Sequence, residues 1–162
     1  MTTRPRRAAG SRNQPQSGTP QGAFEEAKSE IESLRDEMTD WKDNLEGNSM
    51  EHLPKYDEVS ECVGALDQAV SELESAESED WPEALDEITV TWTIDTRRSA
   101  TSRSSRMSNA LNALGAAIDG LSRASDCIEG LSEEDSDACE TIMGHLENAQ
   151  SEAENASFPG MF

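Results

Sequence analysis

Aromatic residues are scarce in this chain of 162 residues, since three tryptophans, three phenylalanines and one tyrosine make up 4% of it. The other apolar residues are mostly alanine, leucine, isoleucine, valine and methionine, which suit narrow helix seams better than broad sheet faces. With 34% of the residues hydrophobic, one modest core is expected and a large globular core is not. The composition therefore favours helices before any pattern is read.

Basic residues are also few, with 13 lysines and arginines against 34 acids and a formal net charge of -21. Such a charge makes unaided binding to a nucleic-acid backbone or an anionic membrane unfavourable. Solubility, adaptation to high salt and mimicry of nucleic acid are three interpretations of the acidity. We therefore expect a protein partner for the acidic body, and no direct nucleic-acid or membrane binding.

Long apolar runs are absent. No stretch approaches the roughly 18 residues of a spanning helix, and the N-terminus lacks the apolar segment of a secretory signal. We expect a cytoplasmic protein. The three cysteines, Cys62, Cys127 and Cys139, have no CxxC spacing and sit beside apolar positions, which is typical of buried free thiols and not of a disulfide framework or zinc site.

The first 22 residues differ in composition from the rest of the chain. They contain Arg4, Arg6, Arg7 and Arg12, no acids, and many Gly, Pro, Gln, Ser and Thr residues. This composition predicts a disordered basic arm at 1–22. The arm could fold back on the acidic body, touch a phosphate backbone or remain an inert tail.

Residues 23–79 read as a helical hairpin, the first part of a helical domain at 23–157. Apolar residues alternate three-residue and four-residue steps in two runs, separated by a short linker at 46–53 that contains Gly47. The seams are Phe24, Ala27, Ile31, Leu34, Met38, Trp41 and Leu45, then Tyr56, Val59, Val63, Leu66, Val70 and Leu73. Each seam must pair with another helix, because an isolated helix of this length is marginal in water.

A connector at 80–96 is ambiguous. Ile88, Val90, Trp92 and Ile94 alternate with three threonines, although several of these residues would also share a helical face. The density of β-branched residues favours a short strand at 88–94. A lone strand needs a partner, most simply from another copy of the chain.

A second hairpin is expected at 97–157. Its seams are Met107, Leu111, Leu114, Ile118, Leu121 and Ile128, then Cys139, Ile142, Leu146, Ala149 and Ala153. Gly130 suits the end of the first helix, and Ser132 with Asp135 resembles a capping box that opens the next. The fold class is therefore all-α, with two helical hairpins that form an antiparallel four-helix bundle or a coiled-coil-like assembly.

Candidate partner contacts lie at the arginines and the apolar end of the chain. Residues 23–96 hold 23 acids and 4 bases, so Arg97, Arg98, Arg103 and Arg106 have many opposite charges available. Intramolecular ion pairs, phosphate binding and subunit pairing are all open to them. The further candidates are Trp92 and the apolar tail at 158–162, through Phe158, Met161 and Phe162.

The sequence shows no motif for catalysis. Neither His52 nor His145 is linked by a motif to a serine or cysteine, and carboxylate pairs are too abundant to single one out. The acidic cluster at 133–140 lacks the glycine and spacing of a calcium loop, and a helix N-terminus explains its charge. No Glu-x-x-His motif supports a carboxylate metal site in a bundle. We therefore predict no enzyme activity, no cofactor and no metal.

Three short stretches, Trp41–Asn44, Lys55–Ser60 and Phe158–Phe162, resemble segments of small acidic helical proteins of phages and mobile elements. The resemblance implies a viral or plasmid setting, in a host cytoplasm or a virion, and carries over no functional residue. We predict a non-catalytic, self-associating helical interaction or assembly protein, such as a phage structural or accessory protein. The alternative is an acidic inhibitor that mimics nucleic acid and binds a basic host protein.

Overall fold

The computed structural model of the chain describes residues 13–96 and 102–159. In chain order these residues form β1 (Asn13–Gly18), α1 (Pro20–Gly47), α2 (Pro54–Glu77), the short 3-10 helix η1 (Glu83–Glu87), β2 (Val90–Asp95), α3 (Arg103–Cys127) and α4 (Glu133–Asn155). The prediction of a mainly helical chain is confirmed. No helix in these two ranges is long and apolar enough to cross a membrane.

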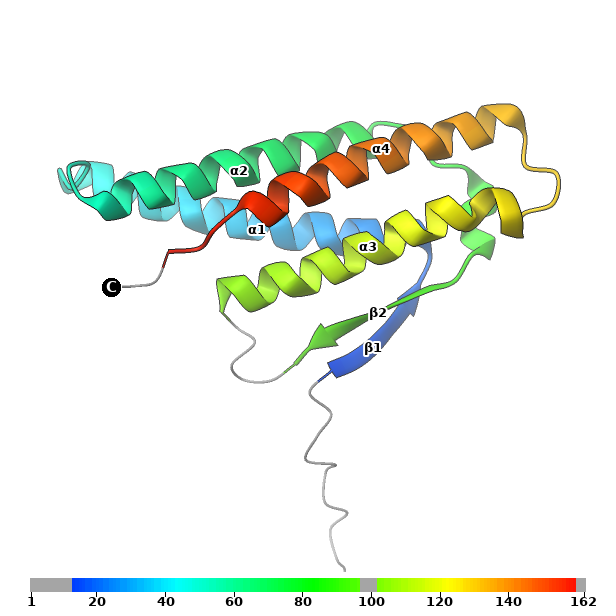
Figure 1. Ribbon diagram of the computed structural model, residues 1–162, viewed down its shortest axis with the longest axis horizontal. Helices are drawn as coiled ribbons and strands as arrows, with labels where there is room; N and C mark the ends of the chain where they lie inside the picture. Colours follow the sequence, from blue (N-terminus) through cyan, green and yellow to red (C-terminus); the bar gives the residue numbers. More distant parts are fainter. Residues whose placement is uncertain (1–12, 97–101, 160–162) are drawn as a thin grey trace, which may run out of the picture.

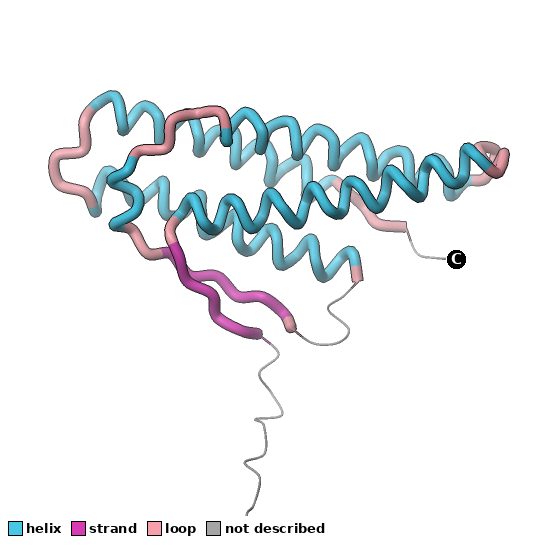
Figure 2. The backbone as a smooth tube through the Cα atoms, turned by 180° about the vertical axis from the view of Figure 1, so that it is seen from behind, coloured by secondary structure: helices cyan, strands magenta, loops and turns pink. Residues whose placement is uncertain are grey.

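The helices lie side by side with their long axes roughly aligned (Figure 1). α1 packs against α2 and α3, and α4 packs against the same two helices. The two strands lie on the outer side of α3, away from α2 and α4 (Figure 2). We call α1 with α3 the α1/α3 layer, and α2 with α4 the α2/α4 layer.

Sequence explains where three of the helices begin. The hydroxyl of Thr19 accepts the Gly22 backbone N–H at 3.0 Å, and Ser102 and Ser132 cap α3 and α4 in the same way. Each hydroxyl satisfies one of the backbone donors that a helix leaves free at its N-terminus. Gly130, with a φ of +75°, makes the left-handed turn between α3 and α4.

The core consists of the predicted seams. Leu34, Leu66, Leu114 and Leu146, one from each helix, have no exposed surface. Five predicted seam residues are only partly buried and pack against the core from its edge: Trp41, Tyr56, Leu111, Ile118 and Ile128. On α3 the buried positions are rich in alanine, because this helix packs against α1, α4 and the strand β2 at once.

The predicted strand in the connector is found at Val90–Asp95, but its partner differs from the expected one. β2 pairs antiparallel with β1 of the same chain, so residues expected in a disordered arm at 1–22 form a strand and the start of α1 from Asn13 onward. The composition gave no sign of this, because Asn, Gln, Pro, Ser and Gly are weak strand formers. Residues 1–12 lie outside the described ranges.

The strands are held to the body by close packing at Gly120 of α3. A Cβ atom added there would lie 2.5 Å from Pro20 Cγ and 2.7 Å from Val90 Cγ1, closer than real Cβ contacts. Only glycine therefore allows the start of α1 and β2 to approach α3 this closely. The free cysteines Cys62 and Cys139 are buried, as predicted.

Candidate interaction surfaces

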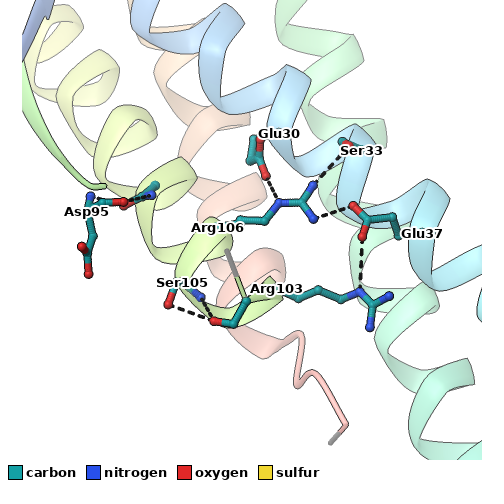
Figure 3. A network of polar contacts seen from close by, with 9 residues as sticks. Glu30, Ser33, Glu37, Asp95, Arg103, Ser105 and Arg106 are labelled. Atoms are coloured by element: carbon teal, nitrogen blue, oxygen red, sulfur yellow. Dashed lines mark hydrogen bonds and ion pairs between the residues drawn. The ribbon is translucent and has the colours of Figure 1, made fainter. Parts of the chain in front are cut away.

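The arginines at the start of α3 contact carboxylates on α1 (Figure 3). Arg106 Nε lies 2.5 Å from Glu30 Oε1, and its Nη1 lies 2.6 Å from Glu37 Oε2. Its Nη2 also donates to the Ser33 hydroxyl at 3.3 Å. Partial burial on its own would lower the pKa of Arg106, but the bonds to Glu30 and Glu37 outweigh it and the net shift is upward.

Arg103 lies one turn before Arg106 and reaches the same α1 surface. Its Nε is 3.5 Å from Glu37 Oε1, and its guanidinium carbon is 5.4 Å from the centre of the Trp41 ring, within cation–π range. Both arginines thus make contacts within the chain, which is the first of the three uses that their charge allowed. Arg97 and Arg98 lie outside the described residues.

Two cavities lie along the line where α1 meets α3. One, of about 650 Å³, is lined by Glu26, Ser29, Glu30, Ile94, Arg106, Asn109 and Ala110. The other, of about 400 Å³, is lined by Glu37, Asp40, Trp41, Asn44 and Arg103. Arg106 contacts Glu30, which lines the first cavity, and Glu37, which lines the second. We call the two cavities together, from Glu26 to Asn44 of α1, the α1/α3 groove.

Strand β2 forms the side of this groove, and asparagines of α3 fix it there. Asn109 accepts the Asp95 backbone N–H at 2.8 Å and donates to the Asp95 carbonyl at 3.3 Å. Asn112 donates to the Thr93 carbonyl at 3.0 Å. The backbone edge of β2 that faces away from β1 is therefore occupied by side chains of α3.

The outer edge of β1 is poorly suited to accept a further strand. Pro15 sits in the middle of this six-residue strand, opposite Thr93. Proline has no backbone N–H, so an added strand would lose a hydrogen bond at the centre of the edge. Trp92, a candidate partner contact, is 8% exposed, and its indole Nε1 has no hydrogen-bond partner among the described residues. It packs inside the protein.

The outer surface of the α2/α4 layer carries most of the unbalanced charge. Within Pro54–Glu77 and Glu133–Asn155 there are 15 acids and one base, Lys55, and no charged residue of the described chain is buried. A side-chain contact links the two helices, with His145 Nδ1 lying 2.9 Å from Glu72 Oε2. Among the described residues, no three histidines, cysteines or acids are grouped closely enough to hold a metal ion.

The loop between α1 and α2 carries apolar side chains on the surface. Met50 and Leu53 are the only large apolar residues of the described chain that are exposed, at 42% and 36%. Beside them, Tyr56 donates to Glu46 Oε1 at 2.6 Å, and this bond raises the pKa of Tyr56 to about 12. Phe158, in the segment after α4, is half-buried against the core and lines a small cavity with Ser104 and Met107 at the start of α3.

Sequence reasoning missed the carboxylates that receive the arginines, Glu30 and Glu37, and missed Met50 and Leu53. Glu30 and Glu37 are seven residues apart and so share one helix face, a spacing that could have indicated a common partner. Of the tail candidates, Met161 and Phe162 lie outside the described residues. Comparisons with protein-family models, with curated proteins and with solved structures found no match.

Proposed function

We propose that the protein is a non-catalytic helical interaction protein that associates with copies of itself. In this proposal the helices form an antiparallel four-helix bundle whose α1–α2 loop end is the self-association surface. One observation carries it: the exposed large apolar residues of the described chain, Met50 and Leu53, are both in this loop. An exposed apolar patch on an otherwise charged body is a common mark of a protein contact.

The charge of the helical body favours the α1–α2 loop end as the self-association surface. Contact between two α2/α4 layers would bring together many carboxylates, since the helices of each layer hold 15 acids and only Lys55 as a base, whereas an apolar contact gains free energy by removing surface from water. The patch is small, so the contact should be weak and concentration-dependent. Salt should strengthen it, because screening reduces the repulsion between two chains of charge -21.

The test is light scattering after size exclusion of the full chain, at several concentrations and at low and high salt. We expect the mass to rise with concentration and with salt for the native chain, and the double variant Met50→Ser/Leu53→Ser to stay monomeric. The matched control is Gln68→Ser, at an exposed position of α2, which should associate like the native chain. A double variant that keeps the native mass would refute the proposed surface.

The α2/α4 layer favours a second candidate function, an acidic inhibitor that mimics nucleic acid. The 24 residues of α2 span about 36 Å, so the 15 acids of the layer place roughly one carboxylate per 2.4 Å. Duplex DNA carries one charge per about 1.7 Å of its axis. On this candidate, a basic DNA-binding protein held by the chain should be released by salt and by competing duplex DNA, while the chain itself stays monomeric at every salt concentration.

A phage as the biological setting is part of the same proposal. The resemblance to small acidic proteins of phages and mobile elements supports a structural or accessory role in a phage, in the host cytoplasm or the virion. Neither candidate function requires a cofactor, a metal ion or contact with a membrane. Light scattering separates the two, because self-association is expected of the first and not of the second.

A further inference from the structure

The α1/α3 groove is lined by apolar residues and has exposed acids at its rim. Ile94 and Ala110 line the larger cavity, and Trp41 lines the smaller one. On the rim, Glu26 and Asp40 form no ion pair with any described residue, in contrast to Glu30 and Glu37, which the arginines of α3 neutralise. The groove therefore offers two carboxylates, one at each end, beside apolar surface.

This arrangement fits the side chain of an arginine better than other groups. A guanidinium would bind the carboxylate of Glu26 or Asp40, while its aliphatic stem covers Ile94 or the part of Trp41 that Arg103 leaves uncovered. A neutral peptide would leave the carboxylates without a partner, and an acidic peptide would be repelled. The complementary occupant is a short, extended, arginine-rich segment.

The chain itself carries such a segment at the edge of the groove. Residues 1–12 contain Arg4, Arg6, Arg7 and Arg12 and no acid, and they precede Asn13, which pairs with Asp95 beside the groove residue Ile94. Twelve extended residues reach about 40 Å. Glu26 and Asn44 of α1 are 18 positions apart, which is about 27 Å along the helix. The segment can therefore run the length of the groove.

We propose that residues 1–12 dock in the α1/α3 groove of their own chain, with arginines on Glu26 and Asp40. Attachment through β1 gives the segment an effective concentration in the millimolar range at this groove, which a segment from another copy lacks. The α2/α4 layer is more acidic but lies on the far side of the body from the strands (Figure 1). Docking would leave that layer unscreened and open to a basic partner.

The proposal is tested on the full chain with a photocrosslinking amino acid, benzoylphenylalanine, in place of Ala9. Mass spectrometry of an equal mixture of ¹⁵N-labelled and unlabelled chains then identifies the crosslinked peptides. We expect crosslinks to 26–44 and 103–110, within single chains only, and their loss at high salt. Crosslinks between labelled and unlabelled chains, crosslinks mainly to the α2/α4 layer, or an even spread over the surface would each overturn the proposal.

A pair of neighbouring glutamates provides the matched variants. Glu26→Lys places a positive charge on the groove rim and should lower the crosslink yield about five-fold, as expected for loss of one partly screened ion pair. Glu25→Lys makes the same change of charge at an exposed position that does not line the groove, and should leave the yield unchanged. Circular dichroism confirms that both variants remain helical. Equal yields from the two variants would also refute docking in the groove.

Discussion

Replacement of Gly120 by alanine tests how the strands are attached to the helical body. Alanine is the better helix former by about 1 kcal/mol, so in an open position of α3 the change should stabilise the protein. At Gly120, however, the new Cβ would lie 2.5 Å from Pro20 Cγ and 2.7 Å from Val90 Cγ1. Neither neighbour can give way cheaply, because Pro20 is a ring at the start of α1 and Val90 is buried in β2. Overpacking of this kind costs about 1–3 kcal/mol.

The net effect at Gly120 should be a loss of roughly 0–2 kcal/mol in the free energy of unfolding. Gly115→Ala is the matched control on the same helix, since a Cβ there would meet nothing within 4 Å, and it should raise the free energy of unfolding. Urea unfolding followed by circular dichroism measures both variants. If Gly120→Ala stabilises the protein as much as Gly115→Ala does, then the close approach of Pro20 and Val90 to α3 is wrong.

Three further predictions concern the core, the ion pairs and the tyrosine. Leu34→Asp buries an unpaired charge at a position with no exposed surface, and should lower the free energy of unfolding in urea by more than about 3 kcal/mol. The control Ser71→Asp, on the exposed face of α2, should lower it little. Arg106→Gln should cost about 1–2 kcal/mol at low salt and less at high salt; a cost independent of salt would contradict the ion pairs with α1. The single tyrosine of the chain, Tyr56, should ionise near pH 12 by tyrosinate absorbance in the native protein and at a lower pH in Glu46→Ala. Folding raises the pKa of Tyr56, so the stability that this tyrosine contributes is complete below about pH 10 and is lost as the pH rises toward 12. If Tyr56 in the native chain ionises at the ordinary pKa of a tyrosine, the bond to Glu46 is ruled out.

The helices were predictable because their signal is local and repeated. Leu34, Leu66 and Leu146 belong to seams with three-residue and four-residue steps, and each is fully buried. Ser132 was predicted as a cap from its own side chain and that of Asp135, and it caps α4. Both kinds of signal depend on residues within a few positions of one another, which is what a single sequence displays.

The sheet and the ion pairs were hidden because they join distant parts of the chain. β1 has a poor strand composition, and its pairing with β2 depends on packing around Gly120, a hundred residues away from Pro20 in the sequence. Arg106 meets Glu30 across 76 positions, and many other carboxylates were equally good candidates by sequence. Composition indicated that the arginines had many acids available within the chain, but only the packing of α3 on α1 selects the carboxylates.

The uneven division of charge connects the fold to the proposed interactions. The α1/α3 layer contains 11 acids and 6 bases, whereas the α2/α4 layer contains 15 acids and one base. The contact between α2 and α4 must therefore be held by buried seam residues such as Leu66, Leu73 and Ile142 against the repulsion of its own surface. A basic partner on this layer would relieve that repulsion in the folded state alone, and binding would then stabilise the fold by mass action. Arg103 and Arg106, already engaged with α1, leave this layer as the strongest unscreened charge that the described chain presents.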